Sequence, residues 1–157
     1  EYCLQDARER GKSGVCMLGA DKQKAWLSDQ AFAQKFGFET VDATEYGYQL
    51  LACSLDGTVP RFSPAAKRGE IDGQELTVYY DFQCPYICQS VELVRQYCGE
   101  RQIPVSLRLV DTQQKAKELP CVFNNWAVFY QGKLQTVNLL DAAALKRMFQ
   151  REEGRPV

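Results

Sequence analysis

Residues 76–94, LTVYYDFQCPYICQSVELV, contain the feature that most constrains the fold of this chain. The segment passes from β-branched and aromatic residues, which favour strands, through a Cys-Pro step into apolar residues at helical spacing. A strand that leads directly into a helix is typical of α/β proteins. The joint also brings Cys84 to the first turn of the helix, where unpaired N–H groups and the positive end of the helix dipole stabilise a thiolate.

The rest of the sequence predicts similar elements on both sides of an irregular segment, DGTVPRFSPAAKRGEIDG, at 56–73. Before it we expect the end of a helix near Gly11, a strand at 13–19, a helix at 28–36 between Ser28 as N-cap and Gly37, and a hairpin of strands at 37–44 and 48–55. After it we expect strands at 75–80 and 104–110, helices at 86–101, 113–119 and 141–150, and two strands near 126–137. This order predicts an α/β fold with a mixed sheet.

Composition excludes several classes of partner and site. A formal net charge of -1 over 157 residues gives no basic surface for nucleic acid, and no apolar run is long enough to span a membrane. The chain has no histidine, so Ser-His and Cys-His nucleophilic sites are excluded for it alone. Its seven cysteines lack the spacing of a disulfide framework, which favours a cytoplasmic location.

Cys84 and Cys88 are the candidate catalytic thiols. They form C-x-x-x-C rather than C-x-x-C, and one helical turn would separate them if both were helical, within reach of a shared soft metal or a strained disulfide. Cys98 lies fourteen residues farther on, about 21 Å along a helix, so we expect no four-cysteine zinc site. Two interpretations stay open: thiol redox or metalloid chemistry at Cys84, or a fold in which Cys84 is only inherited at the helix start.

The segment 124–130 and three further cysteines are expected to pack inside the protein. Alternation in NNWAVFY, 124–130, predicts a strand buried on both faces. Cys3, Cys16 and Cys53 lie on apolar stretches and are expected to be small buried hydrophobes.

Residues 1–55, with WLSDQAFAQKFGFETVDATEYGYQLL at their centre, resemble the carboxyl-terminal half of the GCN5-related N-acetyltransferase (GNAT) fold. The resemblance rests on a helix that closes on Gly37-Phe38 before a strand pair. It implies pantetheine or phosphate contacts at Trp26, Asp29 and Lys35, whereas the residues alone favour a packed Trp26 and solvated charges. The family's R/Q-x-x-G-x-G pyrophosphate loop is absent from the sequence, and Ala33 stands where many members have a tyrosine general acid.

Residues 74–150 resemble the YoaP-like domain, a thioredoxin-like appendage found behind acetyltransferase domains of this type. The resemblance rests on LTVYYDFQCPY, IPVSLRLVDT and KAKELPCVFNNWAVFYQGKLQTVNLL. It implies a cis peptide bond before Pro120 that faces Cys84, with Cys121 and Tyr86 as further neighbours of the redox site and a conceivable cluster of Cys84, Cys88 and Cys121.

Together the two resemblances imply residues 1–55 as a partial acetyltransferase domain, 56–73 as a linker, 74–150 as a thioredoxin-like domain and 151–157 as a tail. The implied cofactor is acetyl-CoA and the implied substrate a small-molecule or peptide amine. We expect the chain to be inactive without a missing amino-terminal half, with that fragment or a second copy as its protein partner. The alternative is a thiol redox or metalloid-binding module centred on Cys84 and Cys88.

Overall fold

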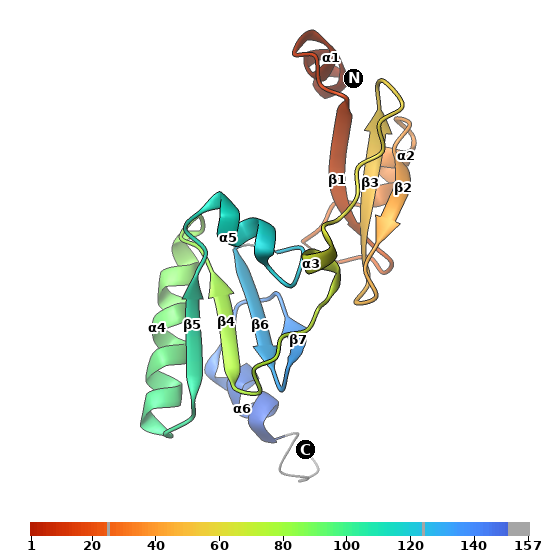
Figure 1. The fold of residues 1–157 in the computed structure, drawn as a ribbon. Coiled ribbons are helices and arrows are strands. Elements are labelled where there is room, and N and C mark those ends of the chain that lie inside the picture. Colours follow the sequence, from red (N-terminus) through yellow and green to blue (C-terminus); the bar gives the residue numbers. More distant parts are fainter. Residues whose placement is uncertain (25, 124, 151–157) are drawn as a thin grey trace. The chain divides into compact units, whose positions relative to one another are not determined.

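The strands of the chain form two separate sheets, one in each half of the sequence (Figure 1). The computed structural model describes residues 1–24, 26–123 and 125–150. Contacts divide the chain into one unit at Glu1–Arg68 and a second that begins at Gly69, inside the segment predicted to be a linker. The tail predicted at 151–157 lies outside the described residues.

The first unit is built on an antiparallel sheet of three strands. Its elements are α1 (Tyr2–Glu9), β1 (Gly14–Ala20), α2 (Gln30–Gln34), β2 (Glu39–Ala43), β3 (Tyr48–Ser54) and α3 (Pro64–Lys67). The sheet order is β1-β3-β2, so the last strand of the unit lies in the middle, with α1 packed against β1. The predicted hairpin is therefore confirmed, and it pairs along its other edge with the strand predicted at 13–19.

Both ends of α2 follow from local chemistry. Gly37 has φ +84°, and the amides of Gly37 and Phe38 donate to the carbonyls of Gln34 and Ala33, which closes the helix as predicted. The predicted N-cap at Ser28 is wrong. The cap is Asp29, whose carboxylate accepts from the Ala31 amide at 2.9 Å, because the helix starts later than expected and a carboxylate suits its positive end.

The second unit has a mixed sheet in the order β5-β4-β6-β7. Its elements are β4 (Leu76–Tyr80), α4 (Pro85–Glu100), β5 (Val105–Leu109), α5 (Gln113–Glu118), β6 (Trp126–Tyr130), β7 (Lys133–Thr136) and α6 (Ala142–Gln150). β4 runs parallel to β5 and antiparallel to β6, and β7 is antiparallel to β6. The predicted α/β fold with a mixed sheet is confirmed.

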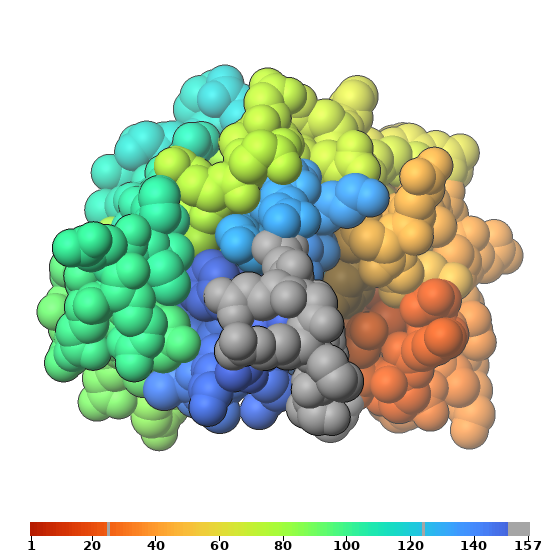
Figure 2. All heavy atoms as spheres, turned by 90° about the horizontal axis from the view of Figure 1, so that it is seen from below, coloured from red at the N-terminus to blue at the C-terminus, as the bar shows by residue number. Residues whose placement is uncertain are grey.

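A hydrophobic core joins one face of this sheet to α4 and α6. Ile87, Val91, Val94 and Cys98 follow one another at helical spacing along α4 and are buried against strand residues and Leu145 of α6. Figure 2 shows the blue atoms of α6 next to green atoms of the α4 region. The strand predicted to be buried on both faces is confirmed, since the side chains from 126 to 129 are at most 2% exposed.

No helix among the described residues is long and apolar enough to cross a membrane.

Candidate functional site

Cys84 lies where β4 leads into α4, and it caps the helix with an extended backbone (φ −111°, ψ 127°). Its carbonyl accepts from the Ile87 amide at 3.1 Å, while its side chain makes no capping hydrogen bond. Pro85 takes the first helical position, where a missing N–H costs nothing because that group would have no helical partner. Cys84 is partly exposed at the amino end of a 16-residue helix and packs against the core.

Cys88 lies one turn farther along and is exposed. Its neighbour Ile87 is 1% exposed and fills the core, so the next position on the helix points to solvent. Cys84 precedes the helix, so the two thiols do not occupy a pair of helical positions. Both are free cysteines.

Cys121 has a different environment from the two thiols near α4. It is 3% exposed, its thiol donates to the Phe123 carbonyl at 3.3 Å, and burial raises its pKa to about 11. At neutral pH this cysteine is a protonated thiol, unsuited to act as a nucleophile or a metal ligand.

Pro120 also differs from the expectation. The described peptide bonds are all trans, so the predicted cis bond before Pro120 is wrong. Leu119, which ends α5, has φ −57° and ψ 138°, an extended conformation that a residue before proline favours, and the chain leaves the helix without a cis bond. The Pro120 carbonyl accepts from the Gly69 amide at 2.8 Å.

The structure does not assemble these cysteines into a metal site. Within residues 1–24, 26–123 and 125–150, no group of three Cys, Asp or Glu side chains could hold a metal ion, so the conceivable cluster of Cys84, Cys88 and Cys121 is not such a group. Cys98 is fully buried in the core, where burial raises its pKa. Cys3 and Cys16 were expected to be buried but are exposed, and Cys53 is only half-buried. Cys3 lies in α1, of which only Ala7 is buried, and Cys16 lies in the edge strand β1.

Asp81, which the sequence analysis missed, lies directly after β4 and is 5% exposed. Its Oδ1 accepts from the amide of Gln83, the residue before Cys84, and its own amide donates to the Asn125 carbonyl at 3.2 Å. Its Oδ2 and the Nε1 of Trp126 are buried and have no hydrogen-bond partner among the described residues. A charged residue at the end of an apolar strand was the signal that could have identified it.

Two exposed aromatic side chains flank the thiol in sequence. Phe82 is 58% exposed and contacts the Tyr80 ring edge-on at 5.4 Å between centroids. Tyr86, predicted to be a neighbour of the redox site, is 66% exposed in the first turn of α4. Phe82 and Tyr86 thus expose apolar rings to solvent on either side of Cys84 in the sequence.

In the first unit, the candidate cofactor-binding residues lie at different ends of α2. Trp26 is 49% exposed, with its ring 6.4 Å from that of Tyr48. Asp29 caps the helix. Lys35 lies at the other end and, with Arg8 of α1, lines an open hollow of about 730 Å³. The structure thus does not gather the three residues around one point.

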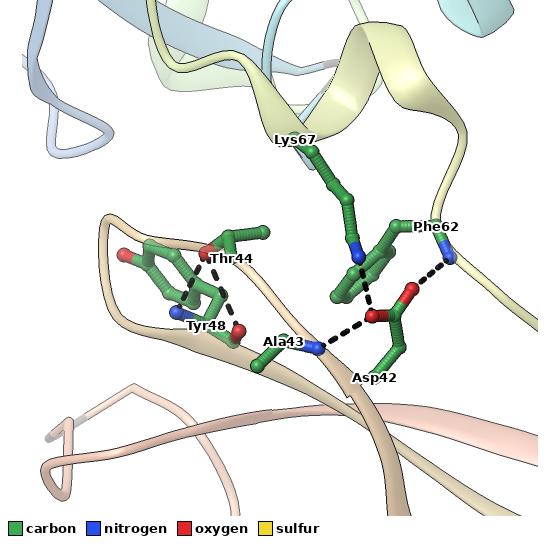
Figure 3. A network of polar contacts seen from close by, with 6 residues as sticks. All are labelled: Asp42, Ala43, Thr44, Tyr48, Phe62 and Lys67. Carbon is green, nitrogen blue, oxygen red and sulfur yellow. Dashed lines mark hydrogen bonds and ion pairs between the residues drawn. The ribbon is translucent and has the colours of Figure 1, made fainter.

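Asp42 holds the segment after β3 against β2 (Figure 3). Its side chain is 9% exposed and accepts from the amides of Phe62 and Ala43, both at 2.9 Å, and from Lys67 Nζ at 2.5 Å. The hydrogen bond from Lys67 is the largest cause that lowers the pKa of this carboxyl. Residues 62–67 therefore belong to the first unit.

Fold and site together define a two-unit α/β protein with a thiol at the amino end of a helix. The family described as YoaP-like matches residues 104–147. A protein of Bacillus subtilis (strain 168) named Uncharacterized N-acetyltransferase YoaP is 23% identical over 150 residues, which cover 94% of this chain. The chain spans 60% of the length of that curated relative. No solved structure matches significantly. The two matches support a relationship to an acetyltransferase family.

Proposed function

We propose that this chain is the carboxyl-terminal part of an acetyl-CoA-dependent N-acetyltransferase, with residues 1–55 as the end of its GNAT domain and 74–150 as a thioredoxin-like appendage. The observation that carries the proposal is the match to the Bacillus subtilis relative, because it extends over 94% of this chain and so includes both units. The order α1, β1, α2, β2, β3 adds support, since the resemblance implies a helix end, a strand, a helix and a strand pair.

The described residues do not fit a complete acetyl-CoA site. Free backbone N–H groups at a helix amino end are a common binding site for a pyrophosphate. The amino end of α2 already receives the Asp29 carboxylate, whose negative charge opposes a phosphate. Among the described residues that line the hollow between α1 and α2, Arg8 and Lys35 are the only ones with positively charged side chains. We therefore derive no step of acetyl transfer from this chain, and we propose that it is inactive alone.

Release of free CoA from acetyl-CoA in the presence of a panel of amines tests this proposal. We expect no turnover by the 157-residue chain, and turnover by a longer native form if intact-mass measurement of the protein from its source finds one. Turnover by the 157-residue chain alone would contradict the claim of inactivity. A longer native form that neither binds acetyl-CoA nor releases CoA would contradict the claim that the protein is an acetyltransferase.

The position of Cys84 favours a second candidate, a thiol redox or metalloid-binding module in the second unit. Cys84 is partly exposed at a helix amino end, and the carboxylate of Asp81 accepts from the amide of the preceding residue, Gln83, while its other oxygen has no partner in the part of the chain that the structure describes. The rate of alkylation of Cys84 at neutral pH tests this candidate, with Cys88 as an internal comparison. A rate no faster than that of free cysteine would remove its main support.

A further inference from the structure

The second unit contains a pocket of about 460 Å³ on the face of the sheet that carries α5. Its apolar lining comes from Val110 and Leu119, which are 8% and 3% exposed, whereas the side chain of Leu109 packs against the core on the other face of the sheet. Figure 1 shows α5 next to the carboxyl ends of β4 and β5, where this pocket lies. Its volume falls within the range of small-molecule sites, roughly 300–1,000 Å³.

Arg108 supplies a fixed positive charge to the pocket. It lies directly opposite Tyr79 in the parallel pairing of β4 and β5, and its Nη1 donates to the Tyr79 hydroxyl at 3.2 Å. Its Nε donates to Ser106 Oγ at 3.1 Å. Both acceptors are neutral, and no carboxylate of the described residues lies within 4.0 Å of the guanidinium. The second hydrogen of Nη1 and both hydrogens of Nη2 are left to bind a carboxylate end-on.

Glu118 supplies the opposite charge from α5. Its carboxylate accepts from Gln114 Nε2, one turn earlier, and no cation of the described residues lies within 4.0 Å of it. Glu118 and Arg108 therefore line one pocket without pairing with each other. Lys115, the other cation of the lining, is neutralised by Asp111 at 2.6 Å.

We infer that this pocket binds a free α-amino acid with an apolar side chain. The carboxylate and ammonium of such a ligand are attached to one carbon, so a single molecule can bridge two opposite charges that lie too far apart to pair directly. Its carboxylate pairs with Arg108, its ammonium with Glu118, and its side chain covers the apolar lining. A simple anion would leave Glu118 uncompensated and would be repelled by it. This inference concerns the second unit alone and goes beyond the proposed acetyl transfer.

Titration of the full chain with L-leucine, followed through the backbone amide resonances of the pocket, tests the inference. L-leucinamide, which lacks the carboxylate, and isocaproate, which lacks the ammonium, serve as matched probes. We expect saturable shifts at Leu109, Val110 and Leu119 with leucine, and at least tenfold weaker binding of either analogue. Equal binding of leucine and isocaproate, or no saturable shift with leucine at tens of millimolar, would overturn the inference.

Substitutions of Arg108 and Glu118 test whether each residue binds the charged group of the ligand that is assigned to it. Arg108→Gln and Glu118→Gln should each weaken leucine binding at least tenfold, and in Glu118→Gln leucine should bind no better than isocaproate. Lys117→Gln removes a neighbouring charge of α5 that does not line the pocket, so it should bind leucine as the unaltered chain does. All three positions are exposed, and unchanged amide spectra outside the pocket report that each variant is folded. Normal leucine binding by either pocket variant would contradict the inference.

Discussion

Replacement of Asp42 by Asn should destabilise the first unit by about 2 kcal/mol. The change removes the negative charge that strengthens the hydrogen bonds to this side chain, and it leaves the volume of the side chain almost unchanged. Hydrogen bonds to a charged group contribute about 1.5–3 kcal/mol and neutral ones about 0.5–1.5, so the bond from the Phe62 amide should lose about 1 kcal/mol. Loss of the ion pair with Lys67 should lower the free energy of unfolding by less than its short length suggests, since the Lys67 side chain is 42% exposed and water screens the pair. All three partners of Asp42 are donors, so none of them can accept from the Asn amide group.

Urea unfolding followed by amide cross-peaks of β3 measures this change for the first unit, and peaks of β6 in the same sample report on the second unit. Asp6→Asn is the matched control, because its pair with Arg10 is exposed and should contribute under about 1 kcal/mol.

The pKa of Asp42 is lowered below its ordinary value of 3.8, so its charge stabilises the fold above that value. The contribution should disappear as the pH falls through the lowered pKa. A loss below 0.5 kcal/mol (roughly the effect of an ordinary surface change), or one unchanged in acid, would refute the reasoning.

Three further predictions concern single positions. At neutral pH iodoacetamide should modify Cys88 while Cys98 and Cys121 resist until the chain unfolds, and mass spectrometry of digested samples should show this order. Gly37→Ala should lower the stability of the first unit by about 1 kcal/mol, measured by the same β3 peaks, because φ is +84° there; an unchanged midpoint would contradict this. Leu145→Ala should cost about 2–5 kcal/mol in the β6 peaks and leave the β3 midpoint unchanged, because Leu145 is fully buried in the second core.

Helix ends that are determined by residues adjacent in the sequence were predictable. Cys84-Pro85 marks the start of α4 because proline fits the first helical position, and Gly37 marks the end of α2 because a positive φ is needed there. The sequence shows Asp81 as a charged residue at the end of an apolar strand, but its burial was not predictable, since it depends on how the end of β4 meets Asn125, more than forty residues away. The same holds for Arg108, whose orientation depends on the register that sets it opposite Tyr79.

The two candidate sites of the second unit, Cys84 and the pocket lined by Arg108, both lie at the adjacent carboxyl ends of β4 and β5. Parallel strands end at the same edge, and ligands of α/β sheets commonly bind there. The chain leaves β4 into α4, which packs on the face that contains Val78, and it leaves β5 into α5, which lines the face that contains Tyr79. Since successive strand residues point to opposite faces, the thiol of Cys84 and the pocket of Arg108 lie on different sides of one edge. Changes to Arg108 or Glu118 should therefore leave the alkylation of Cys84 unaltered, so the pocket and the thiol can be tested separately.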